Sequence, residues 1–216
     1  MRAICLILAT SALLGCNQSP PSAAPRVEPS EPARPEPSKS VLGLELGQDA
    51  NLPECVKERM YGSIYYATFS TNICWKDQSA SGSKSVKPRE MPKEGKLEAM
   101  FPRESVPKGI NTLANIVVIG GKIEQVDLDT FNTADQAEIS TLLTSKWGAP
   151  NRTNVSELQN GFGARFSSLQ EQWNFSDFSI VHIGVVTHEG GLISFQSRVA
   201  FDAEQKRQRE QSAQGF

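Results

Sequence analysis

A proline-rich segment near the N-terminus limits which part of this chain can fold. Residues 17–40 contain seven prolines among 24 positions, with three acidic and three basic residues. Proline interrupts helices and strand pairing, and the segment has almost no apolar side chains from which to build a core. We therefore expect a disordered tether here, with a Pro-rich ligand for a partner as the alternative. The folded domain is expected over residues 41–203, and a polar tail over 204–216.

The composition of the whole chain excludes several classes of protein. Its 216 residues include 22 Lys and Arg against 24 Asp and Glu, a net charge of −2. That balance argues against a globally basic nucleic-acid binder, so we expect no nucleic-acid partner. The two His and four Cys form no dense cluster, so we expect neither a metal site nor a cofactor. No apolar run reaches the roughly 18–20 residues that a membrane-spanning helix needs.

The first 16 residues have the layout of a secretory signal. Arg2 supplies a positive start, and residues 4–14 form a short apolar stretch. The segment ends in Leu13-Leu14-Gly15-Cys16. This ending resembles the lipobox of bacterial lipoproteins, in which the cysteine is acylated and the chain is cut before it. The resemblance implies that residues 1–15 are a signal peptide and that Cys16 becomes the lipid-anchored N-terminus.

The same resemblance implies a destination. Several acyl chains, at about 0.8 kcal/mol per buried methylene, hold a protein firmly on a membrane. Asn17 follows Cys16, and in enterobacterial lipoproteins a residue other than Asp at this position implies passage to the outer membrane. We expect a protein on the outer membrane that faces the periplasm. The outer leaflet of the inner membrane and the cell surface are the alternatives.

Two further cysteines favour a disulfide. Cys5 lies in the signal peptide, so Cys55 and Cys74 remain beside Cys16, with 18 residues between them. Proteins outside the cytoplasm meet an oxidising compartment. A bond closing a loop of this length is worth about 3 kcal/mol. We expect Cys55 and Cys74 to be joined, with two free thiols as the alternative, because the sequence does not supply the Cα distance.

The clearest secondary structure lies in the second half of the chain. Residues 116–119 and 122–128 are β-rich runs joined by Gly120-Gly121, which predicts a hairpin. Thr133 to Gln136 fits a capping box, in which the Thr hydroxyl and the Gln amide satisfy backbone donors at the start of a helix. The helix that it opens should end at Gly148 and Pro150. Its buried face is expected to consist of Ile139, Leu142, Leu143 and Trp147.

The remaining elements complete a fold-class prediction. Strands are expected at residues 64–69, 170–175, 178–186 and 192–201, a short helix at 49–57, and a long loop at 76–96, whereas residues 41–47 read as a strand or a turn. This order predicts an α+β fold, an antiparallel sheet with one main helix packed on one face.

Few residues indicate catalysis. A hydrolase would need a nucleophile and an acid converging on His182 or His188, and Ser179, Ser194 and Asp177 lie near them in sequence. No G-x-S-x-G motif is present. We therefore interpret the two histidines as ordinary sheet and turn residues and expect no catalytic residue. A hydrolase that uses one of them remains the alternative.

Other polar groups have a functional and a structural interpretation. Asp127 and Asp129, two apart on one strand face, suit a cation or acid–base pair, but a solvated strand end is favoured. The basic residues of the loop at 81–96 suit binding to anionic lipid headgroups, which would contribute about 1 kcal/mol of binding free energy per cation. A loop that is merely solvated is favoured. Its basic residues are Lys84, Lys87, Arg89, Lys93 and Lys96. Residues 161–163, Gly-Phe-Gly, read as a turn. Trp75, Trp147 and Trp173 are expected in the core.

A second resemblance bears on function. Residues 113–200, with a strand pair, a helix ending in Lys146-Trp147-Gly148-Ala149-Pro150 and Trp-bearing strands, look like periplasmic lipoprotein domains of the BamE/SmpA kind. That family assists outer-membrane protein assembly, which implies a non-enzymatic domain that binds a protein partner in the envelope. A carrier or sensor of a small ligand is an alternative.

Overall fold

The computed structural model describes residues 37–77, 86–159, 161–187 and 190–214. The expected signal peptide, Cys16 and nearly all of the expected tether lie outside these ranges. Twelve strands and two α-helices are found there, with two 3-10 turns, η1 (Arg103–Ser105) and η2 (Thr133–Asp135), beside them. The strands are β1 (Ser40–Val41), β2 (Leu44–Glu45), β3 (Lys57–Met60), β4 (Ser63–Tyr66), β5 (Cys74–Lys76), β6 (Gly95–Met100), β7 (Ile110–Ile119), β8 (Lys122–Thr130), β9 (Arg152–Gln159), β10 (Arg165–Asn174), β11 (Phe178–Thr187) and β12 (Gly190–Ser197).

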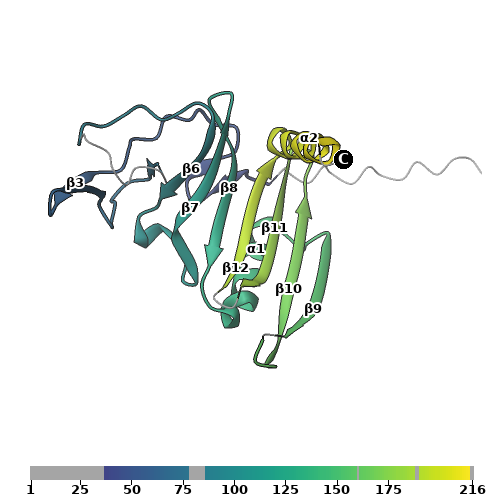
Figure 1. The fold of residues 1–216 in the computed structure, drawn as a ribbon. Helices are drawn as coiled ribbons and strands as arrows, with labels where there is room; N and C mark the ends of the chain where they lie inside the picture. Colours follow the sequence, from purple (N-terminus) through teal and green to yellow (C-terminus); the bar gives the residue numbers. More distant parts are fainter. Residues whose placement is uncertain (1–36, 78–85, 160, 188–189, 215–216) are drawn as a thin grey trace, which may run out of the picture. The chain divides into compact units, whose positions relative to one another are not determined.

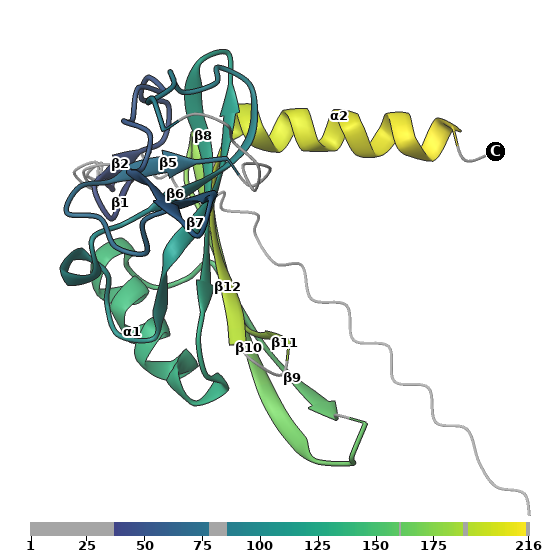
Figure 2. The ribbon, with the colours of Figure 1, turned by 60° about the vertical axis from the view of Figure 1, so that its left-hand side comes forward.

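The main sheet has eight antiparallel strands in the order β5-β6-β7-β8-β12-β11-β10-β9 (Figure 1). Two separate hairpins, β1-β2 and β3-β4, make two-stranded sheets. The helices are α1 (Gln136–Trp147) and α2 (Arg198–Gln214). Figure 2 shows α1 beside one face of the sheet and α2 extending away from the end of β12.

The predicted α+β class with one main helix is wrong. The described chain is mostly β, with the eight-stranded sheet, two small sheets and two short helices, of which α2 is the longer. Four strands were absent from the prediction: β3, β5, β6 and β9. Their sequences alternate poorly between apolar and polar residues, and β9 is exposed along most of its length, so no hydrophobic period marks it.

One face of the sheet carries the core. In β12, every second residue from Gly191 to Ser197 is buried, and the residues between them are half-exposed. Such alternation is typical of an antiparallel sheet with one covered face. The buried side chains of α1, Ile139 and Leu143, join this core. Leu142, expected beside them, is 41% exposed. We call the covered side the helix face and the other side the open face.

The predicted hairpin is confirmed, because β7 and β8 are joined by Gly120 and Gly121 with φ values of 58° and 76°. The predicted helix is present, but the residue that caps its start is different. Asn132 accepts a hydrogen bond from the backbone N–H of Ala134, and η2 precedes α1, so Thr133 is not the cap. Gly148 has the expected positive φ and ends the helix.

Two other local predictions are wrong. Residues 49–57 form no helix, since Asp49 and Glu54 make isolated β-bridges to Lys122 and Trp75. The strand expected to continue to residue 201 stops at Ser197, whose hydroxyl accepts a hydrogen bond from the N–H of Ala200 and starts α2. That helix runs through the boundary expected at residue 203. Within the described ranges, no helix is long and apolar enough to cross a membrane.

Candidate functional site

The open face of the sheet carries rows of mostly polar side chains. Asn174 lies opposite Ser179, Ser179 opposite Gln196, and Gln196 opposite Gln125, so these four residues form one row across β10, β11, β12 and β8. A neighbouring row runs through Gln172, Val181, Ser194 and Asp127. Residues directly opposite each other in antiparallel strands share a face. The strand register therefore gathers amides and hydroxyls that are far apart in sequence.

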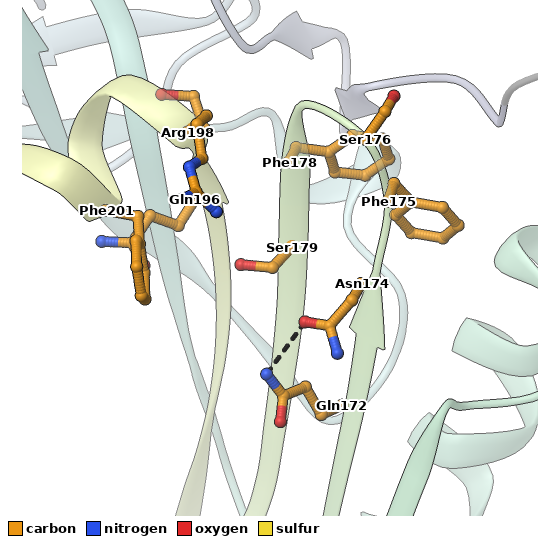
Figure 3. A pocket seen from close by; sticks show the side chains of 10 residues that line it. Gln172, Asn174, Phe175, Ser176, Phe178, Ser179, Gln196, Arg198 and Phe201 are labelled. Atoms are coloured by element: carbon orange, nitrogen blue, oxygen red, sulfur yellow. Dashed lines mark hydrogen bonds between the residues drawn. The ribbon is translucent and has the colours of Figure 1, made fainter.

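A hollow of about 240 Å³ lies where the first row meets the start of α2 (Figure 3). Gln172 donates from Nε2 to Oδ1 of Asn174 at 2.9 Å. Gln196 donates from Nε2 to Oε1 of Gln125 at 3.3 Å. Phe201 is 39% exposed at the edge of the hollow, and the guanidinium carbon of Arg198 lies 5.3 Å from its ring centroid.

The two expected carboxylates do lie on this face, but Asp127 is already engaged. Its Oδ1 accepts from Ser194 Oγ at 2.6 Å, and both its oxygens accept from Gln125 Nε2. Burial, together with the charges of Asp127 and Glu98, raises the pKa of Asp129. Among the described residues, no group of three His, Cys, Asp or Glu side chains is arranged to hold a metal.

A free strand edge forms a second candidate surface. β9 is the last strand of the main sheet and pairs only with β10 in the described chain. Its eight residues are mostly exposed, and Val155 is 60% exposed. The opposite edge is β5, which has only three residues.

A third surface lies beside the turn that leads into α1. Phe131 and Val186 are 52% and 56% exposed and line a hollow of about 380 Å³ together with Leu192. Phe131 follows β8 directly, and Val186 lies near the end of β11. Residues distant in sequence thus form an exposed apolar patch at one end of the sheet.

His182 is a buried residue of the helix face. Its Nδ1 lies 3.0 Å from Oε2 of Glu171, and Oε1 of Glu171 accepts from Ser140 Oγ of α1 at 2.8 Å. The carboxylate lies between the hydroxyl and the imidazole, whereas an activated serine requires the imidazole in the middle. The Nε2 atom of His182 is buried without a partner among the described residues. His188 lies outside the described residues.

The disulfide between Cys55 and Cys74 is present, with a Cα–Cα distance of 4.9 Å. Beside the disulfide, Glu54 is buried, and its carboxylate accepts hydrogen bonds from Lys57, Arg89 and Tyr66. Burial opposes ionisation, but these hydrogen bonds prevail and lower the pKa of Glu54 to about 2. Burial also raises the pKa of the Tyr66 hydroxyl.

Arg89 makes specific contacts within the basic loop, whose described lysines, Lys87, Lys93 and Lys96, are exposed. Its backbone N–H and its guanidinium both bind Glu54, and the guanidinium carbon lies 5.2 Å from the ring centroid of Trp75. Lys84 lies outside the described residues. No sequence signal marked Glu54 and Arg89 as partners, because 35 positions separate them and neither belongs to a periodic pattern.

The remaining expectations concern core and turn residues. Trp75 and Trp173 are 1% exposed, as predicted, and Trp147 is partly buried against the same core. The indole N–H of Trp147 donates to the backbone oxygen of Ser38, so the end of the expected tether is attached to α1. Residues 161–163 belong to the turn between β9 and β10.

Comparison with protein-family models, with curated proteins and with solved structures found no match to this chain. The resemblances to lipoproteins and to the BamE/SmpA kind therefore stay predictions that rest on the residues quoted for them.

Proposed function

We propose that this chain is a bacterial envelope lipoprotein, anchored through Cys16, whose β-rich domain binds a protein partner in the periplasm. The anchor rests on Leu13-Leu14-Gly15-Cys16. The partner rests on one structural observation, the free edge of β9. Assembly of the envelope or of outer-membrane proteins is the process in which we place it.

The edge of β9 is suited to strand addition. A strand at the edge of a sheet presents N–H and C=O groups without partners, and an extended segment of another chain can pair with them. Proteins commonly block such edges with Lys, Pro or very short strands. β9 has eight residues and contains neither Lys nor Pro, whereas β5 at the other edge is short and ends in Lys76.

The exposed apolar patch of Phe131, Val186 and Leu192 supports the same function. Exposed apolar clusters on soluble domains mark interaction sites. Main-chain pairing at a strand edge supplies affinity with little sequence selectivity, and apolar contacts elsewhere add selectivity. A partner that pairs with β9 and also covers this patch would use both surfaces.

Site-specific photocrosslinking in intact cells tests the partner. A photoreactive residue at Val155, on β9, is expected to give a discrete adduct with an envelope protein that mass spectrometry identifies. The matched control is Val56, which is 67% exposed before β3 and should give none. Adducts of equal yield from both positions, or none from Val155, would contradict the proposal.

Replacement of the expected acylation site tests the anchor. Cys16→Ser should prevent lipid attachment and cleavage before residue 16, so the chain keeps residues 1–15 and its mass lacks acyl groups. Cys5→Ser is the matched control and should leave both unchanged. A Cys16→Ser protein with the same mature N-terminus and the same membrane fraction as the parent would contradict lipid anchoring.

A further inference from the structure

We propose that the hollow between the open face and the start of α2 binds a neutral oligosaccharide, with one sugar ring beside Phe201. The proposal does not depend on the proposed function, because it concerns a different surface from the edge of β9. It rests on the chemistry of the side chains that line the hollow and on the charge around it (Figure 3).

The polar atoms of the hollow have capacity left for a ligand. Asn174 accepts one bond at Oδ1 from Gln172, and Gln196 donates one to Gln125. The Ser179 hydroxyl, the Asn174 amide nitrogen and Oε1 of Gln196 have no hydrogen-bond partner among the described residues. Amides and hydroxyls both donate and accept, as do the neighbouring hydroxyl groups of a sugar ring.

These side chains are held in position by the sheet. In Figure 3, Asn174, Ser179 and Gln196 lie on three adjacent strands. Their register makes Ser179 the direct neighbour of the other two across the ladder. Groups on rigid strands bind with a smaller loss of conformational freedom than groups on loops. The row is therefore a preformed set of donors and acceptors.

Phe201 adds an apolar surface beside the polar row. A sugar ring has an apolar face of C–H groups, which an aromatic ring can cover while the hydroxyls at its edge reach amides. Arg198 lies over the Phe201 ring, and its Nε is 3.3 Å from Oδ1 of Asp202. Phe178, in contrast, is buried and stacks on Phe175 with 4.4 Å between centroids, so it belongs to the core.

The charges around the hollow favour a neutral ligand. Arg198 is paired with Asp202, and the neighbouring rows of the open face contain Asp127 and Asp129. Among the described residues that line the hollow, Arg198 is the one charged side chain, and an anionic ligand would compete with Asp202 for its guanidinium. The volume of about 240 Å³ is below the ~300–1,000 Å³ of sites that enclose a whole drug-sized molecule. One ring would occupy the hollow, and the rest of the oligosaccharide would extend over the open face.

The test is a titration of the full chain, labelled with nitrogen-15, with chitotetraose and with maltotetraose, followed by NMR of the side-chain amides. We expect saturable shifts of Gln172, Asn174 and Gln196, with a dissociation constant of about 0.1–1 mM for at least one sugar. Phe201→Ala should weaken binding at least about fivefold, as loss of a ring contact of 1 kcal/mol would do. Phe162→Ala, at another exposed ring, should have no effect.

A second variant separates binding from folding. Ser179→Ala removes a hydroxyl from the hollow without touching α2, and it should also weaken binding while circular dichroism stays unchanged. The proposal is overturned if neither sugar shifts these amides at about 5 mM, well above the expected dissociation constant. It is also overturned if Phe201→Ala binds like the parent, or if an uncharged Gly-Ser peptide produces the shifts and the sugars do not.

Discussion

The imidazole of His182 lies 3.0 Å from the carboxylate of Glu171, and both side chains are buried beneath α1. Ser140 of α1 donates to the second carboxylate oxygen at 2.8 Å. This chain of hydrogen bonds connects α1 to β10 and β11 through polar atoms inside an apolar layer. A buried carboxylate costs free energy unless hydrogen bonds satisfy it, so each partner has a measurable effect on stability.

The contribution of this cluster can be measured by truncation. Ser140→Ala should lower the free energy of unfolding by about 1 kcal/mol, because one hydrogen bond to the buried carboxylate is lost. Ser145→Ala, whose hydroxyl bonds only the local backbone of α1 at Leu142, is the control and should change it by less than about 0.5 kcal/mol. Urea unfolding of the three proteins gives the values. Equal effects of the two substitutions would show that Ser140 does not support Glu171.

A larger effect is expected for the partners of the carboxylate. His182→Ala should lower the free energy of unfolding by about 3–5 kcal/mol, because it leaves Glu171 buried with one partner and opens a cavity. Combined with Ser140→Ala, the loss should differ from the sum of the single losses, since both contact the same carboxylate. Strictly additive losses in a double-mutant cycle would show that Ser140 and His182 are not coupled through Glu171.

The low pKa of Glu54 predicts acid sensitivity. Its pKa is lowered from 4.5 to about 2, so the folded state binds this proton less readily than the unfolded state. The stabilisation is present above pH 4.5 and is lost as the pH falls through about 2. It amounts to about 3 kcal/mol at neutral pH. Measured between pH 2 and 7, the free energy of unfolding of Glu54→Gln should lack this part of the pH dependence. The control is Glu58→Gln, at an exposed site on β3, which should retain it.

The disulfide should stabilise the first half of the domain. Reduction, or the double variant Cys55→Ala with Cys74→Ala, is expected to lower the free energy of unfolding by about 3 kcal/mol, because the unfolded chain regains the freedom of the closed loop. Guanidinium unfolding with and without a reductant gives the value. A change below about 0.5 kcal/mol would contradict a bond formed in the native protein.

Gly191 is required where β12 passes β11. A Cβ atom there would lie 2.1 Å from the backbone oxygen of Ile183, so Gly191→Ala must displace a strand. We expect a loss of at least about 2 kcal/mol in the free energy of unfolding. Gly161→Ala is the matched control, since a Cβ at Gly161 meets no atom within 4 Å. Thermal unfolding followed by circular dichroism measures both, and an equal melting temperature for Gly191→Ala and the parent would show that the strands have room to separate.

Local patterns were sufficient for part of this fold. The Gly120-Gly121 hairpin and α1 follow from turn chemistry and helical spacing, because neighbouring residues determine these features. The disulfide between Cys55 and Cys74 was expected from the predicted export out of the cytoplasm, and the structure decides it against two free thiols. The error over Thr133 and Asn132 is also local, since both side chains suit a cap and the backbone around them decides between them.

The candidate surfaces are formed by strand pairing between residues that are far apart in the sequence. Nothing in the segments around Asn174, Ser179 and Gln196 indicates that they share one hollow, and β9 has no hydrophobic alternation to mark it as a strand. The proline-rich segment, the Leu-Leu-Gly-Cys pattern and the strongest turns can be recognised from the sequence alone, because each depends on residues next to one another. Only the tertiary structure decided which strand was left at the edge and which polar groups met, because antiparallel pairing joins residues that are many positions apart.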